Sequence, residues 1–141
     1  MNEDITGGCL CGAVRYRCTR APISMGLCQC ERCQRQSGSA FLIATVFARD
    51  AVHFESGELK IYAAYGADGA GLYRHFCPEC GAAIMITLER YPDIRSLMGG
   101  SLDDKSLLRP TFSLWCDSAQ PWLRLPPEIE LFAGYPDGLI A

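Results

Sequence analysis

The sequence predicts an all-β fold, and three observations lead to this class. Short runs rich in β-branched and aromatic residues recur along the 141 residues. Turn-forming pairs, such as the glycines at 7–8 and Ser-Gly at 56–57, separate these runs at intervals of about ten residues. The sequence has no segment of about a dozen residues with the apolar stripe of an amphipathic helix. Because no linker or repeat divides the sequence, we expect a single domain over residues 1–141.

Six segments of the sequence fit β-strands. Residues 13–18 alternate Val14, Tyr16 and Cys18 with two arginines, which is the period-two pattern of a half-buried strand. The other segments share short length and β-forming composition, and they cover residues 41–48, 59–65, 72–77, 82–88 and 128–132. Together with the spacing of the turns, these six segments favour an all-β architecture.

Local signals between these segments predict turns and one helical turn. The glycines at 7–8, the Tyr-Pro-Asp sequence at 91–93 and the glycines at 99–100 predict chain reversals. Residues 101–108 could form a short helical turn, and Ser101 stands where a capping side chain is expected.

Composition and charge exclude several classes of partner. The formal net charge of −3 leaves no broad basic surface for nucleic acid, so we expect no nucleic-acid partner. The first ten residues are acidic and polar, and no apolar run approaches the ~20 residues that cross a bilayer. The sequence therefore predicts a cytoplasmic protein with no membrane contact, and it leaves the oligomeric state open.

The cysteines indicate metal binding rather than disulfides. Nine cysteines are an odd number, and the sequence shows no export signal, so reduced thiols are expected. Cys18 and Cys116 stand alone. The other seven fall into three tight groups, which are Cys9 and Cys11, then Cys28, Cys30 and Cys33, and finally Cys77 and Cys80.

A closed zinc site is predicted from the first and last groups. The two-residue spacing of Cys77 and Cys80, with a glycine directly after, suits a tight turn that aims both sulfurs at one metal ion. Tetrahedral zinc needs two further donors, and Cys9 and Cys11 supply them if the glycines around them let the chain bend. The alternative is that these are buried cysteines without a metal.

The middle group predicts an open zinc site. Cys28, Cys30 and Cys33 offer three thiolates, which matches a catalytic zinc that keeps one position free. Zinc with three thiolates is a weak Lewis acid, but it can bind an incoming thiol and lower the pKa of that thiol. Two alternatives remain, namely a Cys30/Cys33 dithiol pair and a structural zinc completed by a distant residue such as His75, Cys18 or Cys116.

These motifs resemble those of the glutathione-dependent formaldehyde-activating enzyme family, also called the centromere-protein-V family. The matching segments are residues 7–16, 28–41, 73–84, 99–104 and 118–122. The resemblance implies a zinc-bound β-tent of several coiled antiparallel sheets, with the four-cysteine set as a structural zinc site and the three-cysteine set at the active centre. It also implies the activity of S-(hydroxymethyl)glutathione synthase, a carbon–sulfur lyase that acts on glutathione and formaldehyde.

Two positions depart from the pattern of this family. Gln29 stands where histidine is common, and Ser113 stands where a later segment often carries histidine. Both departures remove a candidate proton carrier, because glutamine and serine do not titrate near neutral pH.

Arginine and tryptophan side chains near the cysteine motifs are candidates for a substrate pocket. Arg32, Arg35 and Arg74 flank these motifs, and the predicted role for each is to pair with a carboxylate of glutathione. Trp115 and Trp122 could line the pocket, although aromatic residues of a small β domain are also common in the core. Besides the enzyme hypothesis, a zinc-stabilised binding or scaffold module and a thiol redox or metal sensor remain open.

Overall fold

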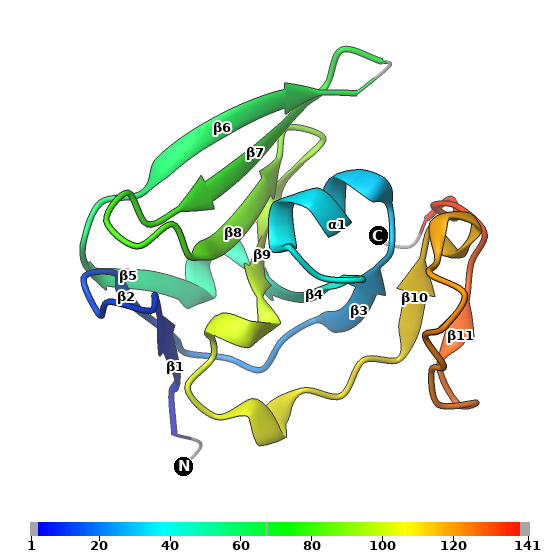
Figure 1. Cartoon of the computed structure of the whole chain (residues 1–141). Coiled ribbons are helices and arrows are strands. Elements are labelled where there is room, and N and C mark those ends of the chain that lie inside the picture. The colour runs from blue at the N-terminus through cyan, green and yellow to red at the C-terminus, as the bar shows by residue number, and fades with distance from the viewer. Residues whose placement is uncertain (1–2, 67, 139–141) are drawn as a thin grey trace.

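The computed structural model describes residues 3–66 and 68–138, and it confirms the all-β class (Figure 1). One short helix, α1 (Glu31–Ser37), and four 3-10 turns accompany the strands in this part of the chain. None of its helices is long and apolar enough to cross a membrane. The strands are β1 (Ile5–Gly8), β2 (Arg15–Cys18), β3 (Ser24–Cys28), β4 (Leu42–Ala48), β5 (Val52–Ser56), β6 (Lys60–Tyr65), β7 (Gly71–Phe76), β8 (Ala83–Leu88), β9 (Tyr91–Met98), β10 (Phe112–Leu114) and β11 (Glu130–Leu131).

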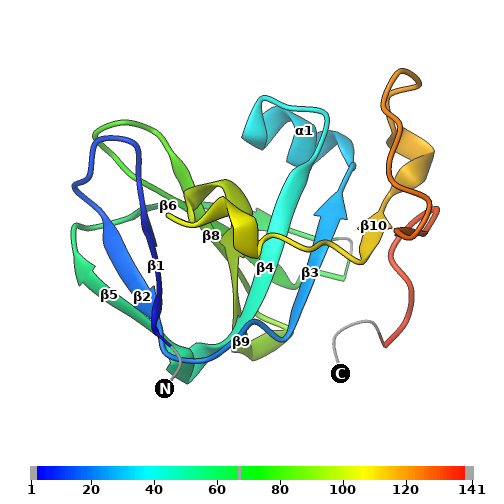
Figure 2. The same cartoon turned by 90° about the horizontal axis from the view of Figure 1, so that it is seen from below.

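The strands form a small and a large sheet. The small sheet has the order β1-β2-β5, and the large sheet has the order β11-β10-β3-β4-β9-β8-β7-β6. Every pair is antiparallel except that β10 runs parallel to both β3 and β11, so the predicted antiparallel pattern holds everywhere but at β10. Figures 1 and 2 show the small sheet at one end of the molecule, β10 at the other end, and α1 between them.

Two groups of buried side chains hold the molecule together. The larger group joins the small sheet to β4, β8 and β9, and its fully buried members include Tyr16, Phe47, Ile84, Leu97 and Leu102. Each large side chain of this kind contributes about 1.5–3 kcal/mol when it is removed from water. The smaller group lies beneath α1 and contains Cys33, Leu42, Ile86 and Met98. The middle cysteine group is thus part of a packed core.

All six predicted strand segments contain a strand, but several other elements were not predicted. These are β1, β3, β5, β9, β10 and α1. The predicted turn at residues 91–93 is wrong, because these residues begin β9 and the chain reverses at residues 89–90. Pro92 is tolerated there because the pairing of β9 with β4 starts only at Ile94, so its missing N–H removes no ladder bond to β4.

Two further predictions about turns are wrong. The glycines at 7–8 lie within β1, where Gly7 faces Tyr16 so closely that a Cβ would lie 2.3 Å from the Tyr16 hydroxyl oxygen. This close approach, rather than a turn, explains the glycine. Ser101 does not cap the later helical turn, because Asp104 accepts the hydrogen bond from the Ser106 N–H at 3.0 Å.

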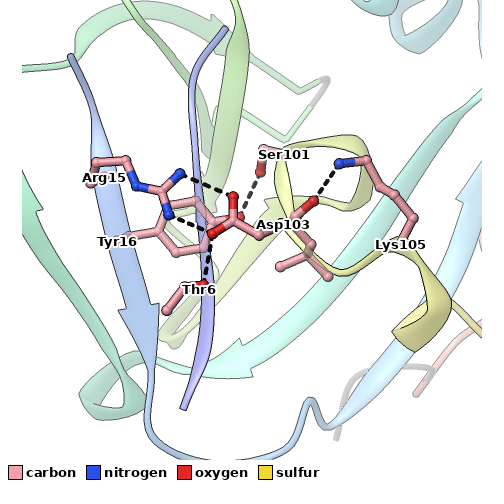
Figure 3. A network of polar contacts seen from close by, with 7 residues as sticks. Thr6, Arg15, Tyr16, Ser101, Asp103 and Lys105 are labelled. Carbon is pink, nitrogen blue, oxygen red and sulfur yellow. Dashed lines mark hydrogen bonds and ion pairs between the residues drawn. The ribbon is translucent and has the colours of Figure 1, made fainter. Parts of the chain in front are cut away.

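A polar network fastens β1 and β2 to the segment that follows β9 (Figure 3). Asp103 accepts hydrogen bonds from the Thr6 hydroxyl at 2.7 Å and from Arg15 Nη1 at 3.0 Å. The Tyr16 hydroxyl lies 2.6 Å from the Ser101 hydroxyl. The hydrogen bond from Arg15, followed by that from Thr6, lowers the pKa of Asp103 to about 2. The network therefore keeps the N-terminal hairpin against the large sheet through a charged pair and a buried hydroxyl contact.

Candidate functional site

Four cysteines from distant parts of the sequence meet at one point. Cys9 and Cys11 lie in the β1–β2 connection, and Cys77 and Cys80 lie in the β7–β8 connection. Their sulfur atoms all lie within 4.8 Å of one another. The Sγ–Sγ distances are 3.6 Å for Cys9–Cys11 and 3.8 Å for Cys11–Cys77. Tetrahedral zinc at ~2.3 Å from each sulfur requires a sulfur separation of ~3.8 Å, so this set fits a four-thiolate zinc site.

Backbone N–H groups around this cluster favour thiolates. The Val14 N–H donates to Cys9 Sγ at 3.2 Å, and Gly81, with φ of 76°, closes the turn after Cys80. Burial alone would raise the pKa of Cys9, but the Val14 N–H and then Cys11 outweigh it and lower that pKa to about 6. For Cys80, N–H groups of the neighbouring backbone likewise lower the pKa. At Cys11 the Ala13 backbone N–H lowers the pKa, but Cys9 and then burial outweigh it and raise that pKa to about 11, so a metal ion in place of the proton would be needed to keep all four sulfurs as thiolates.

The middle cysteine group forms a second cluster at the start of α1. Cys28 ends β3, Cys30 is the N-cap of α1, and Cys33 lies in its first turn. The three sulfur atoms lie within 4.8 Å of one another. The Cys33 N–H donates to Cys30 Sγ at 3.3 Å, so one sulfur takes the role that a capping oxygen usually has. The β3–α1 junction thereby gathers three potential metal ligands in six residues.

The three thiols of this cluster cannot all ionise freely. Hydrogen bonds from Cys28, and then from Cys33, lower the pKa of Cys30, whereas Cys30 and then Cys33 raise the pKa of Cys28. Three ionised thiols so close together would repel one another, and a divalent cation bound in place of their protons would remove this repulsion. The donor set of three sulfurs fits zinc, which commonly binds cysteine thiolates.

None of the three alternative fourth ligands lies with the cluster. His75 faces the other side of β7, and its Nε2 lies 2.9 Å from the Thr87 hydroxyl. Cys18 is buried in the larger core, and Cys116 Sγ lies 3.5 Å from Gln29 Nε2. Among the described residues, the cluster comprises three cysteines and no fourth His, Cys, Asp or Glu within the same distance. A metal ion held there would keep a position for an exogenous ligand.

A large pocket opens beside this cluster. It has a volume of about 660 Å³ and is lined by all three cysteines of the cluster. Alternate residues of β4, β7, β8 and β9 line it, together with residues of β3, of β10 and of the loop after β10. The apolar side chains that line it include Leu27, Leu42, Val46, Leu72, Ile86, Leu88, Ile94, Phe112, Leu114, Trp115 and Tyr135.

Of the three candidate arginines, two reach this pocket. Arg32 lines it from α1 and is exposed, whereas Arg74 lines it from β7 and is 94% buried, with a relative exposure of 6%. Arg74 Nη2 lies 3.9 Å from Cys33 Sγ, and Arg74 Nη1 has no hydrogen-bond partner among the described residues. Arg35 lies on the outer face of α1, where it pairs with Glu31 at 3.0 Å.

The tryptophans occupy different places. Trp115 lines the pocket, with its backbone in the left-handed region at φ of 56°. Trp122 lies outside the pocket, and its Nε1 donates to Gln120 Oε1 at 2.7 Å. The sequence did not point to Ile94 or Tyr135 as pocket residues. The strand pattern of β9 was obscured by its proline, and no local signal marked Tyr135.

The two departures from the family pattern turn out to be in contact. Gln29 and Ser113 are both buried, and Gln29 Nε2 lies 2.9 Å from Ser113 Oγ. Gln29 Oε1 has no partner in the part of the chain that the structure describes. Neither side chain is among the residues that line the pocket. Two neutral side chains that are hydrogen-bonded to each other thus stand where the family often has two histidines.

Comparison with known proteins identifies the family of the chain. The family model described as glutathione-dependent formaldehyde-activating enzyme matches residues 4–118. A protein of Halomonas elongata named "Putative glutathione-dependent formaldehyde-activating enzyme" is 26% identical over 97% of this chain and 92% of its own length. The crystal structure of a Rhodobacter sphaeroides protein is 21% identical, covers 74% of this chain and 91% of its own, and superposes with a TM-score of 0.56, which shows a shared fold. Because the family model spans both cysteine clusters and most of the sequence, the chain belongs to the glutathione-dependent formaldehyde-activating enzyme family.

Proposed function

We propose that the protein is a carbon–sulfur lyase that interconverts glutathione and an aldehyde with their hemithioacetal. Family membership supports the substrate class, and the three-cysteine cluster at the wall of a pocket supports the site. The observation that carries the proposal is the buried Arg74, which lies beside the cluster and whose Nη1 has no partner among the described residues. In this proposal the four-cysteine cluster holds a structural zinc ion, and Cys28, Cys30 and Cys33 hold a second zinc ion.

The chemistry requires an ionised thiol and a donor for the carbonyl oxygen. When bound at the three-cysteine cluster, zinc supplies an electrophilic site that lowers the pKa of a substrate thiol. In the addition, the sulfur–carbon bond forms, the carbonyl π bond breaks, and its electron pair moves to oxygen. The proton lost by the thiol balances the proton that this oxygen gains. The reverse order of the same events cleaves the hemithioacetal.

Arg74 and Arg32 have separate roles in this proposal. Arg74 Nη1 donates a hydrogen bond to the oxygen on which charge develops, and its burial strengthens that interaction because water does not screen it. Arg32, which is exposed at the pocket, pairs with a carboxylate of glutathione. Since Gln29 and Ser113 do not titrate near neutral pH, protons exchange with solvent at the pocket opening.

Zinc analysis combined with calorimetry tests this function. Protein purified under reducing conditions should contain two zinc ions per chain and should bind glutathione saturably. A Cys30→Ser variant should lose one zinc ion and should no longer bind glutathione. Cys116 lies outside both clusters, so Cys116→Ser should keep two zinc ions and should still bind glutathione. One zinc ion and no glutathione binding in the unmodified protein would contradict the proposal and would favour a zinc-stabilised binding module.

A further inference from the structure

The pocket beside the three-cysteine cluster is far larger and more apolar than formaldehyde requires. We propose that the carbonyl substrate is an aldehyde with an extended apolar chain or ring, bound along the sheet face while its oxygen meets Arg74. This inference rests on the proposed function, because it identifies the substrate class of that same site.

The volume argues against a one-carbon substrate. A cavity of about 660 Å³ lies within the ~300–1,000 Å³ that ordinarily enclose a ligand of many atoms. Even with glutathione on the α1 side of the pocket, formaldehyde would leave the apolar side chains of β7, β8 and β9 in contact with water. An aldehyde that carries a chain or ring would instead remove the lining from water, and each added methylene is worth roughly fourfold in affinity.

The distribution of charge separates a place for glutathione from a place for the aldehyde. The charged residues of the lining are Glu31 and Arg32, which are exposed at the start of α1, and Arg74 beside Cys33. Glutathione carries two carboxylates and an ammonium group, which lose hydration unfavourably in an apolar cavity. Its body therefore remains on the α1 side of the pocket. The apolar wall opposite is left to the second substrate.

That apolar wall is built by alternate residues of neighbouring strands. Leu72 on β7, Ile86 and Leu88 on β8, and Ile94 on β9 all line the pocket. Arg74 is two residues beyond Leu72 on the same strand, so the two side chains share a face. An aldehyde whose oxygen lies at Arg74 can thus extend its carbon chain along Leu72 and the adjoining strands.

Trp115 closes this wall at a cost in backbone strain. Its φ of 56° is unfavourable for a residue with a side chain, and such conformations are concentrated at binding sites. The indole packs beside Gly134, where a Cβ would lie 3.5 Å from Trp115 Cζ3. Tyr135, the next residue, also lines the pocket. The strained backbone places an aromatic ring where an apolar ligand would contact it.

Stable thioethers of glutathione provide a direct binding test. S-methylglutathione and S-hexylglutathione share the glutathione body and the same sulfur environment, so the ratio of their dissociation constants reports only the alkyl chain. Calorimetry on the zinc-loaded protein should give at least tenfold tighter binding of the hexyl compound. In steady-state assays with glutathione, kcat/KM should likewise be higher for hexanal than for formaldehyde.

A variant of Trp115 tests the wall without a large risk of misfolding. Trp115→Gly removes the ring at a backbone conformation that glycine adopts readily, so the folded state should be retained. The preference for the hexyl compound should fall at least threefold. Trp122→Ala, which removes an exposed indole outside the pocket, should leave the preference unchanged.

The outcomes separate this inference from the proposed function. Binding of glutathione with equal affinity for the methyl and hexyl thioethers would overturn the inference and leave the function standing. Binding of hexanal without any binding of glutathione or its thioethers would support the apolar pocket and overturn the function. Failure of all these ligands to bind would overturn both.

Discussion

Arg74 is the residue in which burial and chemistry conflict most clearly. A guanidinium that is 94% buried ordinarily has a carboxylate partner, yet the described ion pairs do not include Arg74. The cation lies instead beside Cys33 Sγ. A zinc ion with three thiolates carries a net charge of −1, by subtracting three charges from two. Arg74 would neutralise this group and still keep one donor for a ligand.

Replacement of Arg74 should separate a catalytic role from a structural one. Arg74→Lys keeps the charge but has one nitrogen where the guanidinium has Nη1 and Nη2, so it cannot stay beside Cys33 and also reach the aldehyde oxygen. We therefore expect kcat/KM to fall by about 10²-fold, as for the loss of one oxyanion donor. Binding of S-methylglutathione, which lacks the reacting oxygen, should change less than threefold. Steady-state kinetics, calorimetry and zinc content of the same preparation provide the comparison. An equal loss of thioether binding and of kcat/KM would show that Arg74 acts on the fold or the metal.

Asp103 gives a prediction with a defined pH dependence. Its folded-state pKa is about 2, below the ordinary 3.8, because Arg15 and Thr6 donate to the carboxylate. A depressed pKa contributes stability above the unfolded-state value, and this contribution is lost as the pH falls through the folded-state value. The side chains of Arg15 and Asp103 are 38% and 45% exposed, so solvent screening keeps the effect near about 0.5–1 kcal/mol.

Asp103→Asn should therefore lower the free energy of unfolding at pH 7 by that amount. The difference from the unmodified protein should shrink as the pH falls from about 4 to about 2. Urea unfolding of both proteins at several pH values measures this difference, and any loss of metal in acid affects both alike. A difference that is constant over this range would rule out the ionised pair as its cause.

At the scale of elements, the missed helix α1 shows what local patterns can and cannot reveal. Its seven residues are too short for a helical stripe, and its N-cap is a cysteine rather than a usual capping residue. The Ser-Gly pair at 37–38, which resembles a turn, is its C-terminus, with Gly38 at φ of 67°. The cysteine group, and not sequence periodicity, thus marks the start of the helix.

Features of the site that lie within a few consecutive residues could be predicted from the sequence, whereas features that depend on distant segments could not. The spacing within each cysteine group is a local property, so the clusters could be predicted from the sequence. The pocket depends on the pairing of β9 with β4, which joins residues more than 40 positions apart and which no local pattern specifies. Arg35 and Arg74 looked alike in sequence because both flank cysteines. Only helix direction and strand alternation separate the exposed Arg35 from the buried Arg74.

Gly38 offers a test of how α1 ends. A Cβ at this position would meet no atom within 4 Å, so Gly38→Ala adds only the backbone cost of a left-handed conformation, about 1 kcal/mol. Gly100 also has open space around it but does not have a φ in that region, so Gly100→Ala is a matched control. Urea unfolding should show a loss of about 1 kcal/mol for Gly38→Ala and less than about 0.5 kcal/mol for the control. Equal effects would contradict the role given to this cap.

At the scale of the whole molecule, the two cysteine clusters differ in how far apart along the chain their cysteines lie. The four-cysteine cluster joins the N-terminal hairpin to the β7–β8 connection, and Cys11 and Cys77 are 66 positions apart along the chain. The three-cysteine cluster spans only residues 28–33. A bond that closes a long loop restricts the unfolded chain more than one that closes a short loop. Zinc at the first cluster should therefore stabilise the whole fold, whereas zinc at the second should act mainly on the pocket.

Single substitutions in the two clusters should consequently have opposite profiles. Cys80→Ser removes a ligand from the cluster that joins the N-terminal hairpin to the β7–β8 connection, and it should reduce the free energy of unfolding by at least about 3 kcal/mol. Cys30→Ser replaces a ligand within one β3–α1 junction, so it should cost about 1 kcal/mol while it abolishes binding of glutathione thioethers. Urea unfolding and zinc content measure the two variants side by side. If Cys30→Ser were the more destabilising change, the second cluster would be the structural site, and the carbon–sulfur chemistry would have to be placed elsewhere on the molecule.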